Sequence, residues 1–331
     1  MGHELVSRPA RLLAASLLGL GLAAAPVATT LASDVTVGAG MRASAKVYDP
    51  DSGDTVSTTS VDDVRLYVSG KVSDDISFMF NTDYDNTVGN VDVIDAAAQF
   101  KLSDTSNIWA GRFLAPSDRA NLYGGYYANN WNFPTAVQDL YPFKTTGRDD
   151  GVMYWGQFGI AKIAAGIFSN TYGTAEYKYA GRAQFDFWDP EGGYYQNGTY
   201  YGAKDVLAFA VAAQGASGDN SFTGDFLLEK KLMGGGVVSL EAEGAKFDGY
   251  GGKGSGYYGL AAYLFPQVVG IGKFQVLGKF GQVKPKGGST YNSTELNINY
   301  IIKDQNCRLS LYYLDPDSNY KTYGLGLQVQ M

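Results

Sequence analysis

The chain is poor in the residues that carry most catalytic and covalent chemistry. Its one histidine, His3, lies close to the N-terminus, so the rest of the chain can hold no Ser-His-Asp triad and no histidine metal site. Its one cysteine, Cys307, has no partner for an internal disulfide. Carboxylate pairs such as Glu241 and Glu243 are better explained as solvated charges than as a hydrolytic site. We therefore expect no enzyme, no cofactor and no metal ion.

Long apolar runs are absent too. Outside the N-terminal segment, no stretch reaches the roughly 18 apolar residues that a membrane-spanning helix needs. The net charge of −7 argues against nucleic acid as a partner. Arg8 and Arg11 precede a short apolar stretch, and small residues follow as far as Ala32. This order predicts a signal peptide over residues 1–32 and an exported chain from residue 33 onward.

The residues that are abundant are aromatic residues and glycine, and they come with a two-residue alternation. The chain contains 25 tyrosines, 17 phenylalanines and 43 glycines, which suit strands and turns better than helices. Phe274, Val276 and Phe280 alternate with Gln275 and Lys279, so one face of this segment is apolar and the other is polar. Similar alternation recurs along the chain with no helical segment to cover it. The pattern predicts a closed barrel with lipid outside and water inside.

Alternation and turn residues divide the chain into about sixteen strands, which predicts an all-β fold, a transmembrane antiparallel β-barrel. The expected strands of the first half are residues 35–48, 62–73, 75–84, 91–102, 106–113, 150–157, 160–170 and 179–188. Those of the second half are residues 203–215, 220–232, 235–248, 255–266, 271–284, 290–303, 306–315 and 320–331.

The connections alternate between short polar turns and longer loops, and an even strand number places both chain ends on the periplasmic side. The connection 189–202 is long where a short turn is expected, which means either an insertion or an error in the strand count. Aromatic residues near strand ends are expected in interfacial girdles, namely Trp109, Trp155, Trp188, Tyr312 and Tyr313.

Residues 114–149 are the one long interruption of the strand pattern. The segment is rich in tyrosine, tryptophan and phenylalanine, which a solvated tail would not be. Loops of this length are uncommon and usually functional. We expect this long third extracellular loop to fold inward and narrow the lumen. A surface plug, or a loop that packs against a neighbouring subunit, is the alternative.

Two stretches resemble the phosphate-selective porins O and P. They are residues 111–124, GRFLAPSDRANLYG, and residues 188–208, which begin WDPEGGYY and end YYGAKDVLA. The resemblance implies a sixteen-stranded barrel, usually a homotrimer, that passes small solutes and often anions. It also implies the outer membrane of a Gram-negative cell as the location.

Anion selectivity needs arginine or lysine where the channel is narrow. The candidates for pore constriction and ion selectivity are Arg112, Arg119, Lys144 and Arg148 at the loop and Arg42, Arg65 and Arg182 on strands, with Lys162 weaker. Acidic residues that can oppose them are Asp118, Asp139, Asp149 and Asp150. We expect a weak anion preference that falls when Arg112 or Arg119 is changed to Ala. A structural role for each arginine, tying the loop to the wall, is the alternative.

The first functional hypothesis is therefore an outer-membrane porin for passive diffusion of small polar solutes and ions, with a preference for anions or phosphate as one form of it. Its partners would be the lipid bilayer, the permeating ions and other copies of the chain. A barrel sealed by its loop, serving as a scaffold or adhesion protein, is the second hypothesis. A secreted soluble β-sandwich that binds glycans is the third.

Overall fold

The structure is a computed structural model. It describes residues 35–85, 89–133, 147–169, 177–216, 218–249, 252–317 and 320–331. The predicted signal peptide, residues 1–32, lies outside the described residues.

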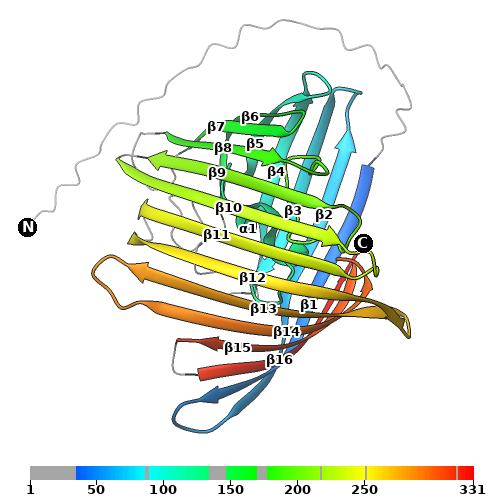
Figure 1. The fold of residues 1–331 in the computed structure, drawn as a ribbon. Coiled ribbons are helices and arrows are strands. Elements are labelled where there is room, and N and C mark those ends of the chain that lie inside the picture. Colours follow the sequence, from blue (N-terminus) through cyan, green and yellow to red (C-terminus); the bar gives the residue numbers. More distant parts are fainter. Residues whose placement is uncertain are drawn as a thin grey trace, which may run out of the picture. The chain divides into compact units, whose positions relative to one another are not determined.

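Sixteen antiparallel strands close into a barrel in which neighbours in sequence pair and β16 pairs with β1, as predicted (Figure 1). The first eight are β1 (Val35–Pro50), β2 (Val56–Lys71), β3 (Ile76–Asp85), β4 (Asn90–Lys101), β5 (Ser106–Leu114), β6 (Arg148–Phe158), β7 (Ala161–Phe168) and β8 (Lys178–Asp186). The others are β9 (Val206–Ala216), β10 (Asp219–Lys231), β11 (Val237–Gly249), β12 (Gly252–Val269), β13 (Gly272–Pro285), β14 (Tyr291–Lys303), β15 (Cys307–Pro316) and β16 (Tyr320–Gln330). The helix α1 (Arg119–Tyr127) lies between β5 and β6.

The two ends of the barrel differ in their connections. The end that holds the first residues of β1 and the last residues of β16 also carries the short turns, and we call it the turn end. These turns are residues 72–75, 102–105, 159–160, 232–236, 270–271 and 304–306. The long connection 187–205 joins β8 and β9 at this same end. The strand count was therefore right, and the extra length is an insertion.

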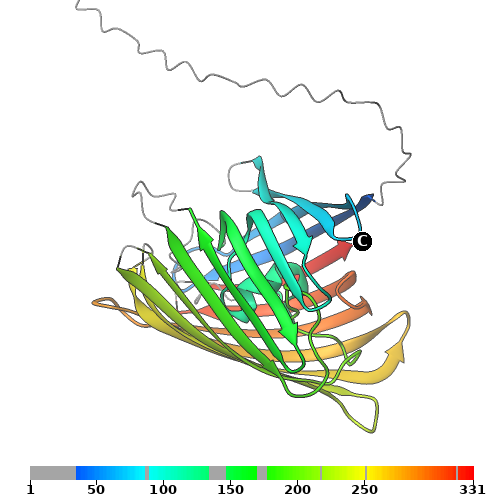
Figure 2. The same ribbon diagram turned by 90° about the horizontal axis from the view of Figure 1, so that it is seen from above.

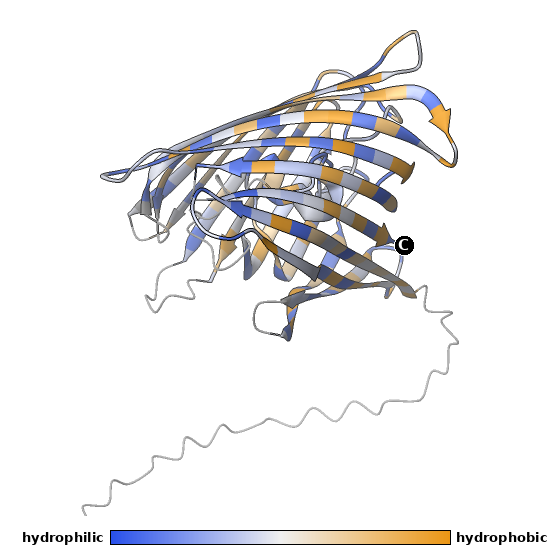
Figure 3. Cartoon of the chain, turned by 90° about the horizontal axis from the view of Figure 1, so that it is seen from below, coloured by the Kyte–Doolittle hydropathy of each residue, from blue (hydrophilic) through white to orange (hydrophobic). Residues whose placement is uncertain are grey.

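The wall of the barrel exposes its apolar face and buries its polar face. On β13, Phe274, Val276 and Phe280 are 39%, 41% and 43% exposed, whereas Gln275 and Lys279 are 1% and 6% exposed. Figure 3 shows the same alternation of apolar and polar residues along the strands. Only lipid outside the barrel makes this arrangement favourable, because water on that face would leave the apolar belt unburied. The soluble β-sandwich hypothesis is therefore wrong.

The aromatic girdle was predicted only in part. Trp188 is 41% exposed on the outside, as expected. Trp109 and Tyr312 are buried at 7% and 2% exposure, and Trp155 packs against the same inner cluster as Trp109. Tyr312 stacks on Trp131 with the ring centroids 5.8 Å apart. The prediction is wrong for these three residues because segments inside the barrel offer them packing partners.

Candidate channel constriction

The connection between β5 and β6 folds into the barrel. Figure 2 shows α1 within the ring of strands, and residues 113–123 are all buried. The Asp118 side chain accepts a hydrogen bond from Asn121 N at 2.8 Å and caps the start of the helix. Residues 115–133, which we call the loop segment, therefore narrow the lumen. Residues 134–146 of the predicted loop lie outside the described residues.

The start of α1 points its backbone amides at carboxylates of the wall. Arg119 N donates to Asp225 Oδ2 on β10 at 3.2 Å, and Ala120 N donates to Glu243 Oε2 on β11 at 3.2 Å. The first amides of a helix have no partner within the helix and carry its positive dipole end. Acidic wall residues are therefore suited to hold this end, and burial raises the pKa of Asp118 beside them to about 6.

The end of the loop segment is held through its backbone carbonyls. Arg308 on β15 donates to Ala128 O at 2.7 Å, to Asn129 O at 3.2 Å and to Asn130 O at 3.3 Å. Glu295 on β14 accepts from Trp131 N at 3.1 Å. Arg308 and Glu295 are both fully buried, so the loop segment replaces the water that these charges would otherwise need.

A second segment enters the lumen from the turn end. Within the connection between β8 and β9, residues 190–204, which we call the turn segment, pack inside the barrel, where Glu191 and Thr199 are fully buried. Glu229 of β10 accepts hydrogen bonds from Thr199 Oγ1 at 2.7 Å and from Gly202 N at 2.8 Å.

The two segments meet inside the barrel. Arg119 donates to Glu191 through both terminal nitrogens, with Nη1 2.8 Å from Oε1. Burial alone would lower the pKa of Arg119 and raise that of Glu191. Each charge outweighs this effect on its partner, so the pKa of Arg119 rises and that of Glu191 falls. The pair is therefore held as ions without contact with water.

Part of the inward face of β5 to β7 is apolar, beside the buried charges Asp149 and Lys162. The buried cluster on this side includes Trp109, Phe113, Met153 and Phe168 of the wall, with Leu122 of α1 and Tyr194 of the turn segment. The expectation of water against the whole inner face is therefore wrong here, because the two segments form a small hydrophobic core with the wall.

Two predicted selectivity residues of the wall hold the inner segments, Arg182 the loop segment and Lys162 the turn segment. Arg182 binds Asp225 with Nη2 2.9 Å from Oδ1, and it donates to Ser117 O at 2.9 Å. Lys162 donates to the backbone oxygen of Glu191. These groups are buried at 6% exposure or less.

Other predicted residues are also placed in structural contacts. Arg42 donates to Trp131 O, and its guanidinium carbon lies 4.2 Å from the Trp131 ring centroid. Arg148 pairs with Asp95 at 2.8 Å. Asp149 accepts from Lys178 Nζ at 2.5 Å. Two further predicted residues, Asp139 and Lys144, lie outside the described residues.

Arg112 does not face the lumen. It alternates along β5 with Phe113, which belongs to the inner cluster, and so lies on the opposite face. It pairs there with Asp150 at 3.3 Å, with side chains 24% and 63% exposed. We had expected Arg112 at the constriction because it opens the long loop. Its strand register decides the side that it faces.

Charges on the inward face of β2 and β3 keep some contact with water. The side chains of Asp63, Arg65 and Asp83 are 15%, 15% and 24% exposed, and Arg65 lies 3.4 Å from Asp63 and 3.1 Å from Asp83. The loop segment contacts them through buried Tyr126, whose ring centroid lies 5.3 Å from the Arg65 guanidinium carbon, and the neighbouring Tyr127 is 37% exposed. Gly124 is bent out of the helix at φ 64°, and a Cβ there would lie 3.7 Å from Arg65 Nη1. We call the inward faces of β2 and β3 the open sector. The closed sector comprises the inward faces of β5 to β16 and of residues 40–44 of β1.

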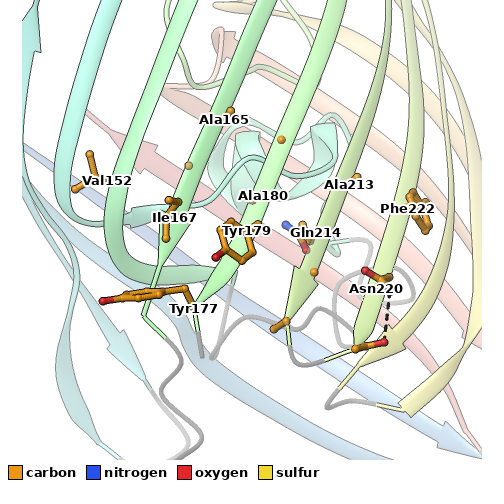
Figure 4. Close-up of a pocket in the computed structure, with 15 residues that line it drawn as sticks. Val152, Ala165, Ile167, Tyr177, Tyr179, Ala180, Ala213, Gln214, Asn220 and Phe222 are labelled. Carbon is orange, nitrogen blue, oxygen red and sulfur yellow. Dashed lines mark hydrogen bonds between the residues drawn. The ribbon is translucent and has the colours of Figure 1, made fainter. Parts of the chain in front are cut away.

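The hollow described next lies on the outer surface of the barrel and not in the lumen. A hollow of about 1140 Å³ lies on the outer face of β6 to β10, lined by Val152, Ile167, Tyr179 and Phe222 among others. Figure 4 shows these side chains in front of the strands and α1 behind them. Small residues such as Gly181 create the hollow, which belongs to the apolar belt.

Within the described ranges, no helix is both long enough and apolar enough to cross a membrane. In the same residues, no cluster of three or more histidine, cysteine or acidic side chains is arranged to hold a metal ion.

No protein-family model and no curated protein matches the sequence. Solved structures do match the fold. An anion-selective porin from Comamonas acidovorans is 12% identical with a TM-score of 0.63, covering 90% of this chain and 100% of that chain. OprB of Pseudomonas putida at high pH is 9% identical with a TM-score of 0.66, covering 90% and 94%. OmpF of Salmonella typhi, in complex with daunomycin, is 11% identical with a TM-score of 0.61, covering 90% and 97%.

The functional residues that sequence analysis missed hold the two segments in place. They are Glu191, Glu229, Glu295 and Arg308. Each of the three strand residues is a charge on the polar face of its strand, which marks it as inward-facing. Which backbone groups each one binds depends on the path of distant segments. The closed barrel with an exposed apolar belt is the architecture of outer-membrane porins, and the outer membrane is the location of this chain.

Proposed function

We propose that the chain is an outer-membrane porin, a channel rather than an enzyme, through which small polar solutes and ions diffuse passively. The observation that carries this proposal is the open sector. Its charged side chains keep contact with water, whereas the loop and turn segments cover most inward charges of the closed sector. Solutes would pass between this wall and Tyr127 of the loop segment.

Selectivity along this path would be weak. Arg65 is the cation in the open sector, and Asp63 and Asp83 lie beside it. A positive charge flanked by carboxylates attracts anions less strongly than an isolated arginine does. The weak anion preference stays a prediction, and Arg65 replaces Arg112 as the residue expected to set it. Phosphate preference and a homotrimer follow from the resemblance to phosphate-selective porins and are proposed on that ground.

A sealed barrel that serves as a scaffold is the second candidate. The burial of so many charges in the closed sector favours it, since Glu295, Arg308 and Glu229 have no contact with water. The two candidates differ in conductance. Purified folded protein in a planar lipid bilayer should give stepwise current if it is a porin. Folded protein that gives no current would establish the sealed barrel. Cross-linking in mild detergent would test the homotrimer.

A further inference from the structure

The turn segment departs from the wall where two backbone hydrogen bonds join its flanking residues. We call the flanking residues 187–189 and 205–207 the neck. Phe187 N donates to Leu207 O at 2.8 Å, and Asp189 N donates to Asp205 O at 3.0 Å. The β8–β9 ladder therefore continues to Asp189 and Asp205 before residues 190–204 depart. A short hairpin could close the ladder at this point, so the barrel wall does not need the turn segment.

The turn segment nevertheless buries strongly polar groups. Glu191 is fully buried, and Gln196 is 2% exposed. Burying a carboxylate is costly unless it is paired and hydrogen-bonded. Glu191 meets this cost with Arg119 and with the Tyr200 hydroxyl, which donates to Oε1 at 2.7 Å. A turn with only a connecting role would lie in solvent, where its carboxylate costs nothing.

Most contacts of the turn segment with the loop segment use backbone groups, which fix its position. Gln196 N donates to Leu122 O of α1 at 3.3 Å. Gly198 N donates to Tyr127 O at 3.0 Å. Tyr127 is the exposed loop residue beside Tyr126, which contacts the open sector. The turn segment therefore binds the carbonyl of the residue that borders the proposed path.

We propose that the turn segment is a second constriction element, which enters from the periplasmic end and sets the width of the channel. It does so by holding the loop segment through Glu191 and Gly198. This inference rests on the proposed porin function. Glu191 acts as a positioning residue because it touches the loop segment and not the solute. Without the turn segment, the space that it fills would be water, and the loop segment would lose its support on that side.

The first experiment removes the turn segment. Residues 190–204 are replaced by Asn-Gly, which favours a tight hairpin. Circular dichroism and heat-modifiable migration in gels show whether the barrel has formed. The folded variant is expected to conduct at least about twofold more than the native chain in planar bilayers, since a wider lumen is left open. Equal conductance of the two folded proteins would overturn the inference and leave the porin function standing.

A point variant covers the case in which the shortened chain does not fold. Glu191→Gln keeps the size of the side chain and removes its charge, so Arg119 loses its partner in the turn segment. We expect noisier current and a larger mean conductance. Asp205→Asn is the matched control, because Asp205 lies at the neck, pairs with Lys230 at the surface and does not touch the loop segment. Equal effects of both variants would contradict the role of Glu191.

A cysteine pair tests the contact itself. With Cys307 changed to Ser, Gly198→Cys and Ala128→Cys should form a disulfide, since a Cβ at Gly198 would lie 3.3 Å from Ala128 Cα. Oxidation should then quiet the current, and reduction should restore it. Folded protein that forms no disulfide would overturn the inference. A native chain that does not conduct, beside a shortened chain that does, would support the turn segment as a plug and refute the porin function.

Discussion

The closed and open sectors of the lumen wall have the same alternation of polar and apolar residues, but their inward charges differ in exposure to water. In the closed sector Glu295 and Arg308 are fully buried against the loop segment. In the open sector Arg65 and Asp83 remain 15% and 24% exposed. The difference shows that an inward charge is not in itself a selectivity residue. Whether a segment inside the barrel covers the charge decides its role.

The closed sector also explains why the loop segment stays in place. Buried charges are costly, and removing one partner of a buried pair costs about 3–5 kcal/mol. Here the partners of the wall charges are mainly backbone groups of the loop and turn segments. Loss of these contacts would leave Arg308 and Glu229 buried with fewer hydrogen bonds, whereas Glu295 would keep its pair with Lys279 at 2.7 Å. The charges of the wall therefore favour a lumen that the loop and turn segments fill.

The largest effect is expected from Arg308→Ala in the closed sector. The variant removes the donor to three backbone carbonyls and should lower the free energy of unfolding by about 3–5 kcal/mol. Denaturant titration of protein folded in liposomes measures it. Arg308→Lys keeps the charge but loses the forked geometry, so its loss should be smaller. Unchanged stability in Arg308→Ala would mean that the loop segment is held elsewhere.

A pH-dependent effect is expected at the start of α1. Burial raises the pKa of Asp118 from 3.8 to about 6, so the folded protein retains a proton that the free carboxyl loses. The stabilisation from this proton is complete below about pH 4 and is lost as pH rises through about 6. Asp225, Glu243, Arg119 and Arg182 are the charged groups that surround it.

Thermal unfolding between pH 4 and pH 7 tests this window. Asp118→Asn keeps the capping ability and removes the titration, so the stability of this variant should depend less on pH. An unchanged pH profile in the variant would assign the dependence to another group.

The open sector should respond through ion preference instead of stability. Arg65→Ala should lower the chloride-to-potassium permeability ratio about two- to fivefold, since a unit charge at 4 Å in water contributes about 1 kcal/mol. Reversal potentials in a salt gradient measure the ratio. Asp83→Asn removes the negative charge beside Arg65 and should therefore raise the permeability ratio. A ratio that neither change alters would place the path of the ions away from β2 and β3.

The smallest effect is expected from Arg112→Ala on the outer face. Its pair with Asp150 is exposed, and such pairs contribute about 0–1 kcal/mol. The permeability ratio should remain that of the native chain. A changed permeability ratio would mean that Arg112 faces the lumen, which would contradict its register on β5.

Sequence analysis predicted the wall well and the interior poorly. All sixteen strands were expected, fifteen of them within a few residues of their observed bounds; the second was expected to begin at residue 62 and begins at Val56. The inward side was right for Arg182 and Glu241. The interior was not readable in the same way. Trp109 has the position of a girdle residue, but its partner Tyr194 comes from the connection between β8 and β9, far away in the sequence. No local sequence pattern predicts a contact between residues so far apart in the chain.

The sequence by itself determined the barrel, because alternation is a local property that strand geometry turns directly into two faces. It also marked the long loop and the overlong turn as departures from that pattern. Only the tertiary structure decided which charges meet water. Arg119 and Glu191 lie 72 residues apart, and their pairing depends on two segments that enter the lumen from opposite ends. Burial depends on what covers a side chain, and distant parts of the chain supply that cover.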